Sequence, residues 1–139
     1  MREMNRRLTD AALSFAASLP SADQDALLNW FIELLEIRGQ QTSKIDKLKA
    51  ALICTKRHKA VWPVIRGLKS VLVQHGWKER GKHVRWGIVA SALAISIFGL
   101  HGAGIAALGG AVGVPLWIIF GSGGTIASVI VEELSSKRS

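Results

Sequence analysis

The sequence predicts an all-α protein with a small N-terminal helical bundle, a basic amphipathic helix and a C-terminal, glycine-rich transmembrane helical hairpin. Three observations predict this fold. Apolar residues recur at helical spacing through residues 8–72, basic residues dominate residues 38–85, and residues 87–131 contain no Asp, Glu, Lys or Arg. We therefore divide the chain into an N-terminal helical region (1–55), a basic amphipathic juxtamembrane segment (56–86), a two-span membrane hairpin (87–131) and a short polar tail (132–139).

Two amphipathic helices are predicted at the start of the chain. Residues 8–19 carry apolar side chains at helical spacing, with Thr9 as the expected N-cap and Pro20 as the stop. Ser21 and Gln24 then match an S-x-x-Q capping box, which opens the second helix. One broad apolar stripe marks this second helix: Leu27, Trp30, Phe31, Leu34 and Leu35.

Two further helices complete the expected bundle. The third begins at Thr42 or Ser43 and has an apolar side opposite a basic side. The fourth follows Lys59 and is basic and amphipathic, and Pro63 is tolerated only in its first turn. Four short helices give a marginal core, so docking on a membrane or a partner would help to stabilise the bundle.

The middle of the chain is strongly cationic. Residues 38–85 hold 13 basic and two acidic residues, a net charge of +11 against +8 for the whole chain. Such a block attracts polyanions, and its position beside an apolar run favours the anionic cytoplasmic leaflet over nucleic acid. The residues expected to contact the membrane surface are Lys56, Arg57, Lys59, Arg66, Lys69, Trp77, Lys78, Arg80, Lys82, Arg85 and Trp86.

The uncharged run of 45 residues is about twice the length that one helical span needs. Its turn is expected at residues 101–104 or at residues 108–111, and the second choice gives spans of 87–107 and 112–131. Positive charge flanks both ends of the run, which predicts a protein of the cytoplasmic membrane with both termini in the cytoplasm. Insertion is favourable but not overwhelming, so it can be conditional.

Ten of the 14 glycines lie in this run, and small residues recur at every fourth position. Four-residue spacing aligns them on one helix face, where two backbones can approach closely. The packing can occur inside one hairpin or between copies in a homo-oligomer, and the spacing fits both. The predicted packing residues are Gly99, Gly102, Ala103, Ala106, Ala107, Gly110, Gly123, Gly124, Ala127 and Ser128.

No catalytic, cofactor or metal site is expected. The segment from Gly76 to Lys82 approximates a P-loop but is followed by His83 instead of Ser or Thr, and residues 102–107 approximate a dinucleotide fingerprint without its acidic partner. His58, His75 and His83 lie in basic surroundings, which oppose a bound cation. The single cysteine, Cys54, is expected to be a small buried apolar residue.

These features predict a non-enzymatic membrane effector whose hairpin inserts, self-associates and permeabilises or deforms the membrane. In outline, residues 87–131 resemble the hydrophobic hairpins of pore-forming bacteriocins and the glycine-zipper segments of bacterial toxic or abortive-infection effectors. The likeness rests on composition.

Two alternatives stay open. In a membrane-anchored adaptor, the N-terminal helices would bind a protein partner through a stripe such as Trp30, Phe31 and Leu34, although such a stripe is more often core. In a nucleic-acid-binding protein, the basic block would contact phosphates without a recognisable reading motif.

Overall fold

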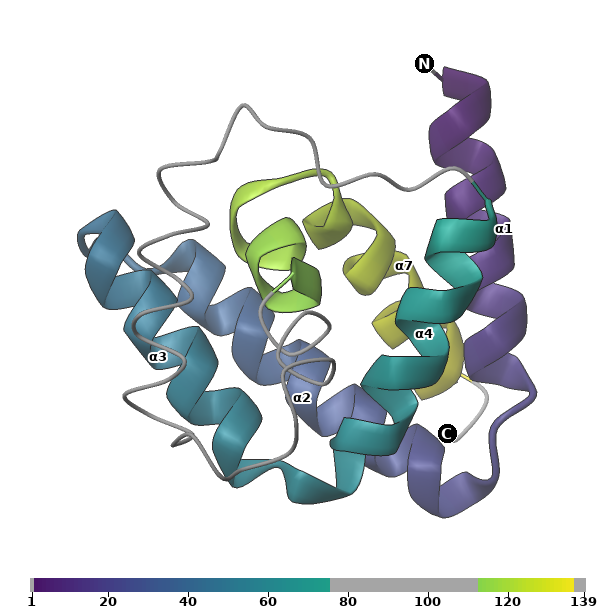
Figure 1. Cartoon of the computed structure of the whole chain (residues 1–139), viewed down its shortest axis with the longest axis horizontal. Coiled ribbons are helices and arrows are strands. Elements are labelled where there is room, and N and C mark those ends of the chain that lie inside the picture. Colours follow the sequence, from purple (N-terminus) through teal and green to yellow (C-terminus); the bar gives the residue numbers. More distant parts are fainter. Residues whose placement is uncertain (1, 76–112, 137–139) are drawn as a thin grey trace.

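The computed structural model describes residues 2–75 and 113–136, and these residues are all-α, as predicted (Figure 1). The helices and their bounds are α1 (Arg2–Ala17), α2 (Ser21–Gly39), α3 (Lys44–Arg57), the 3-10 helix η1 (Lys59–Val61), α4 (Trp62–Gln74), an unlabelled helix (Gly113–Phe120) and α7 (Gly123–Ser136). The predicted first span, both candidate turns and the segment 76–86 lie outside the described residues.

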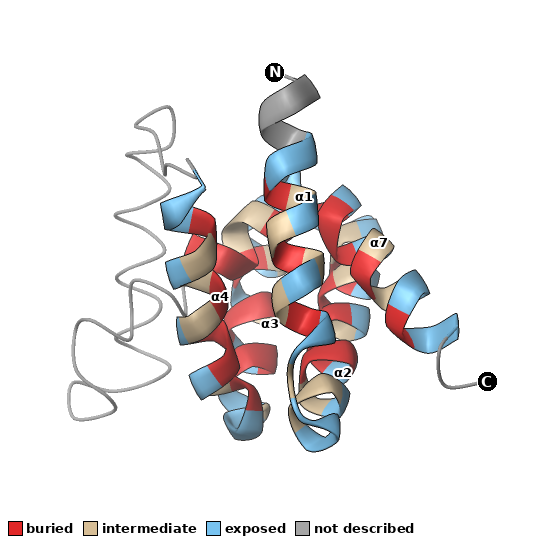
Figure 2. Cartoon of the chain, turned by 90° about the vertical axis from the view of Figure 1, so that its right-hand side faces the viewer, coloured by how far each residue is buried: buried red, intermediate tan, exposed pale blue. Residues whose placement is uncertain are grey.

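The C-terminal helix α7 packs against both α1 and α2, while α3 packs on α2 and α4 packs on α1. In Figure 1, α7 (yellow) accordingly lies between α2 and α1. Figure 2 shows the buried residues on the sides of the helices that face one another. One hydrophobic cluster joins residues of the N-terminal helices to residues of 113–136, so the described end of the predicted hairpin shares a core with the helical bundle.

The first helix starts earlier than predicted. It begins at Arg2, so Thr9 lies inside the helix and is not its N-cap. No Pro or Gly interrupts residues 2–8, and basic and apolar residues there are compatible with a helix. Apolar spacing identifies the part of a helix that packs on a core, and it gives no signal for a preceding turn whose residues are mostly polar.

The junction between α1 and α2 uses Gln24 differently from the predicted capping box. Pro20 occupies the N-cap position of α2, and helix α2 begins at Ser21. The Gln24 Nε2 amide donates hydrogen bonds to the carbonyls of Ala16 at 3.0 Å and Ala17 at 3.2 Å. These carbonyls belong to the last turn of α1, where intrahelical donors run out, so Gln24 ties the end of α1 to the start of α2.

The predicted starts of the next two helices are confirmed. Ser43 is the N-cap of α3, and its hydroxyl oxygen accepts from the Asp46 backbone N–H at 3.1 Å. Pro63 lies in the first turn of α4, where its missing N–H removes no helical hydrogen bond. Further along α4, a Cβ at Gly67 would come 2.8 Å from the Phe15 ring, so glycine lets α1 and α4 approach closely.

The described part of the second predicted span is not one straight helix. Within residues 2–75 and 113–136, no single helix is long and apolar enough to cross a membrane. Only together are the helices Gly113–Phe120 and Gly123–Ser136 long and apolar enough for one span, and the chain bends by 91° between them. Their buried side chains include Val114, Ile118, Ile119, Ile126, Ala127, Ile130 and Leu134.

Candidate functional site

The bend between the helix Gly113–Phe120 and α7 is held by Arg38, from the last turn of α2. One guanidinium nitrogen, Nη1, donates to the carbonyl of Ile118 at 2.7 Å and to the carbonyl of Gly121 at 2.9 Å. These carbonyls lie at the C-terminal end of a helix, where the partial charge is negative and a cation is favoured. We call this arrangement of Arg38, Ile118, Gly121 and Gly124 the Arg38 corner.

Arg38 is itself positioned by the next helix. Its backbone carbonyl accepts from the Lys47 ammonium group at 2.9 Å, which satisfies an oxygen at the end of α2. A charged donor makes stronger hydrogen bonds than a neutral one. The hydrogen bonds of the Arg38 guanidinium therefore join α2 to the apolar C-terminal segment, about 80 residues later in the sequence. The Lys47 ammonium group adds a charge-assisted bond from α3 to the same residue.

Two of the predicted small residues, Gly123 and Gly124, allow the close packing at this bend. A Cβ at Gly124 would lie 2.8 Å from the Arg38 guanidinium carbon, and a Cβ at Gly123 would collide with the Trp117 ring. Trp117 also donates from Nε1 to the Ser122 hydroxyl at 3.2 Å, across the bend. In the described state, the close approaches at these glycines are therefore made within the chain, to an arginine and a tryptophan.

The other predicted packing residues divide into two groups. Ala127 is buried in the core, while Ser128 is exposed and donates from its hydroxyl to the Gly124 carbonyl at 2.9 Å. The remaining six lie outside the described residues: Gly99, Gly102, Ala103, Ala106, Ala107 and Gly110.

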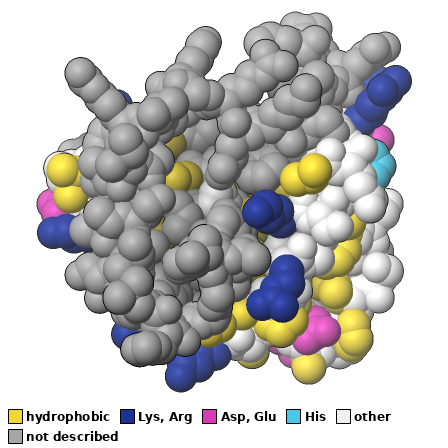
Figure 3. Space-filling model, viewed as in Figure 1, with side chains coloured by type: hydrophobic (Ala, Val, Ile, Leu, Met, Phe, Trp, Pro, Cys, Tyr) yellow, Lys and Arg dark blue, Asp and Glu magenta, His cyan; other side chains and the backbone are white. Residues whose placement is uncertain are grey.

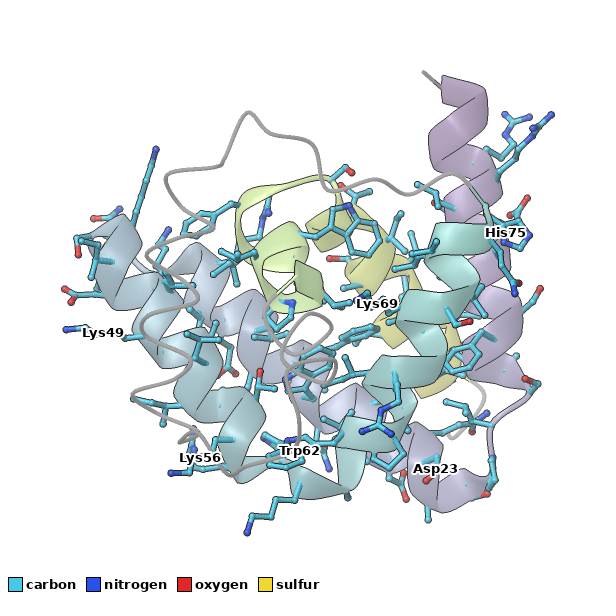
Figure 4. All side chains as sticks on the ribbon, in the orientation of Figure 1. Asp23, Lys49, Lys56, Trp62, Lys69 and His75 are labelled. Carbon is cyan, nitrogen blue, oxygen red and sulfur yellow. The ribbon has the colours of Figure 1, made fainter. Side chains whose placement is uncertain are left out.

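The described basic residues lie at the surface. Lys56, Arg57, Lys59 and Arg66 are exposed and Lys69 is half-buried. Lys56 points away from the body of the protein in Figure 4, and so does Lys49, which lies earlier on α3. Figure 3 shows Lys and Arg side chains interspersed with hydrophobic ones on the described part of one face. The other predicted membrane-surface residues lie outside the described residues: Trp77, Lys78, Arg80, Lys82, Arg85 and Trp86.

The stripe considered as a protein-binding surface lies in the core. Trp30 and Leu34 are 0% exposed and Phe31 is 2% exposed. The Trp30 indole N–H donates to the Thr55 hydroxyl at 3.0 Å, and this hydroxyl donates to the Ala51 carbonyl at 2.8 Å. The Trp30 side chain therefore joins α2 to α3, and the three buried side chains offer no surface to a partner.

A second polar site lies where α2 meets the end of α3, and we call its residues Glu33, Cys54, Arg57 and His58 the Glu33 cluster. The Cys54 thiol donates to Glu33 Oε2 at 3.0 Å, and Arg57 Nη2 lies 3.2 Å from the same oxygen. His58 Nε2 lies 3.2 Å from the other oxygen, Oε1. The thiol is fully buried, while the Glu33 side chain is 37% exposed and that of His58 is 23% exposed.

The pKa values of the two acidic groups of the Glu33 cluster, Cys54 and Glu33, shift in opposite directions. Burial, followed by the hydrogen bond to Glu33, raises the pKa of Cys54 to about 12. The thiol hydrogen bond, together with His58 and Arg57, lowers the pKa of Glu33 against the opposing effect of burial. A neutral thiol that donates to a carboxylate is the arrangement these shifts describe.

The sequence contains one signal for the Glu33 cluster that was not among the predicted sites. Cys54 and His58 are four residues apart, which places them on one side of a helical turn. Cys54 was predicted to be a small buried apolar residue, so this pair was not predicted as a ligand site. Glu33 comes from another helix, so only the packing of α2 on α3 brings it to the pair.

Comparisons of this chain with protein-family models, curated proteins and solved structures find no significant match.

Proposed function

We propose that this protein is a membrane effector whose apolar C-terminal segment is packed in a helical domain and inserts into anionic membrane conditionally. The observation that carries the proposal is the Arg38 corner. Most apolar side chains of 113–136 lie in the core of the helical domain, and a single arginine holds the bend between their two helices. A span long enough to cross a bilayer would require this bend to straighten.

The free energies of membrane insertion and of release from the domain favour conditional insertion. Residues 112–131 include ten Ile, Leu, Val and Phe, which favour insertion by roughly 3–6 kcal/mol. Release from the domain loses the two Arg38 hydrogen bonds, at about 1.5–3 kcal/mol each, and removes apolar side chains from the core. Because the two hydrogen bonds alone are similar in size to the insertion term, and the loss of core packing adds to the cost, the segment needs a further contribution before it leaves the core.

The basic surface can supply that contribution. Each Lys or Arg close to an anionic leaflet adds about 1 kcal/mol, and Lys56, Arg57, Lys59 and Arg66 are all exposed. We infer that the cationic helices approach the cytoplasmic leaflet first and that the apolar segment then inserts. In the inserted state both termini are cytoplasmic, and the freed faces of Gly123 and Gly124 pack against other helices of a homo-oligomer.

Vesicle leakage tests this function. Purified full-length protein should float with vesicles that contain anionic lipid and should release an encapsulated dye, whereas zwitterionic vesicles should stay intact. Strong binding without leakage would favour a membrane anchor over a permeabilising effector. Absence of binding to both kinds of vesicle, combined with a salt-sensitive shift of duplex DNA, would favour the nucleic-acid alternative.

A further inference from the structure

We propose that Glu33, Cys54 and His58 form a binding site for a divalent, thiolate-preferring metal ion such as Zn²⁺. The site is separate from the Arg38 corner and does not depend on the proposed membrane function. Among the described residues, these three are the group whose carboxylate, thiol and imidazole could converge on one ion. Sulfur, nitrogen and oxygen from such side chains are the ligands that Zn²⁺ takes in proteins.

The distances suit one ion with little rearrangement. All ligand atoms lie within 4.8 Å of one another, and the carboxylate oxygens lie 3.0 Å from the sulfur and 3.2 Å from the imidazole nitrogen. Tetrahedral Zn²⁺ with bonds of about 2.0–2.3 Å places neighbouring ligand atoms roughly 3.3–3.6 Å apart. Small side-chain rotations therefore open the hydrogen-bonded cluster to the spacing of a coordination shell.

The three ligands come from firmly held positions. Glu33 is on α2, Cys54 is in the last turn of α3, and His58 is the residue between α3 and η1. Near Glu33 on α2, the side chains of Leu34 and Ile37 are buried, and Cys54 belongs to the hydrophobic core of the domain. A metal at this point would join α2 to the end of α3, and the partly exposed side of the site leaves a fourth position for water.

Charge and proton balance are consistent with binding. The ion displaces the Cys54 thiol proton to solvent, and the resulting thiolate and the Glu33 carboxylate together neutralise its two positive charges. His58 must be neutral, with its proton on Nδ1, so that Nε2 can bind the metal. Arg57 then loses its partner oxygen, and its side chain, which is 66% exposed, can turn to solvent.

Nearby cations oppose the incoming ion. Arg57 lies on Glu33, and Lys56 and Lys59 flank the cluster in the sequence. We therefore expect a moderate affinity that increases when Arg57 is removed.

Cobalt spectroscopy tests this proposal on full-length protein that has been treated with a chelator and dialysed. Addition of Co²⁺ should produce a thiolate-to-cobalt charge-transfer band and the intense visible bands of tetrahedral cobalt, at one ion per chain, and Zn²⁺ should displace it. Cys54→Ser should abolish the charge-transfer band. Glu33→Gln and His58→Gln should each weaken binding by at least about 100-fold, since even loss of a residue that only supports a ligand costs 10- to 100-fold.

Matched variants separate coordination from damage to the fold. Glu36→Gln and His75→Gln change exposed residues of the same types outside the cluster and should leave the affinity unchanged. Arg57→Gln should tighten binding. The proposal is overturned if Co²⁺ gives no tetrahedral spectrum, or if variants with wild-type circular dichroism at Glu33 and His58 bind as tightly as the controls.

Discussion

Replacement of Arg38 by Gln should loosen the apolar C-terminal segment while the rest of the domain stays folded. The variant loses the two charge-assisted hydrogen bonds to Ile118 and Gly121, and a glutamine is too short to replace both. Such bonds contribute about 1.5–3 kcal/mol each when shielded from water, and because Arg38 is half-buried, solvent screening lowers each to about 1–1.5 kcal/mol. The expected cost is about 2–3 kcal/mol, confined to the bend and α7.

Native-state hydrogen exchange measures this cost locally. Since 1.4 kcal/mol corresponds to a factor of ten, amides of α7 should exchange about 30- to 150-fold faster in Arg38→Gln, while those of α3 should change little. Arg66→Gln removes the same charge from an exposed position on α4 and should leave α7 unaffected. Equal acceleration in all helices, or none in α7, would refute the role assigned to Arg38.

Three other predictions follow from the described contacts. Gly124→Ala should destabilise α7 by about 1–3 kcal/mol in urea unfolding, because the new Cβ displaces Arg38, whereas Gly39→Ala meets open space and should be neutral or stabilising. In metal-free protein at pH 8, Cys54 should be alkylated more slowly when folded than in urea, because its pKa is raised to about 12. Its contribution to stability is present below the unfolded thiol pKa and is lost as the pH rises through about 12, and Glu33→Gln should speed alkylation. Binding to anionic vesicles should weaken as salt rises from about 0.1 to 1 M, where the screening length falls from about 10 to 3 Å.

Helical periodicity predicted the central helices well, because their apolar residues face one core. The buried positions of Leu27, Trp30, Phe31 and Leu34 match the predicted stripe of α2. Local capping chemistry also predicted the start of α3 at Ser43. It failed for Gln24, whose side chain reaches back to α1, because a capping motif specifies nearby spacing and not the contacts of the folded chain.

The environment of the apolar run could not be predicted in the same way. A stretch without charge satisfies a lipid bilayer and a protein core equally, and composition does not distinguish them. The small residues did predict close approach, but for Gly123 and Gly124 the described partners are Trp117 and Arg38. The Glu33 cluster was hidden for a related reason, since its members come from two helices and meet only through packing.

A label on α7 tests most directly whether the apolar segment leaves the domain for lipid. Ser128 is exposed on α7, so Ser128→Cys in a Cys54→Ser background accepts an environment-sensitive fluorophore without disturbing the core. We expect an aqueous spectrum in solution, and a blue shift with quenching by bilayer-depth brominated lipid once anionic vesicles are added. A label that stays aqueous on vesicle-bound protein would contradict insertion of this segment.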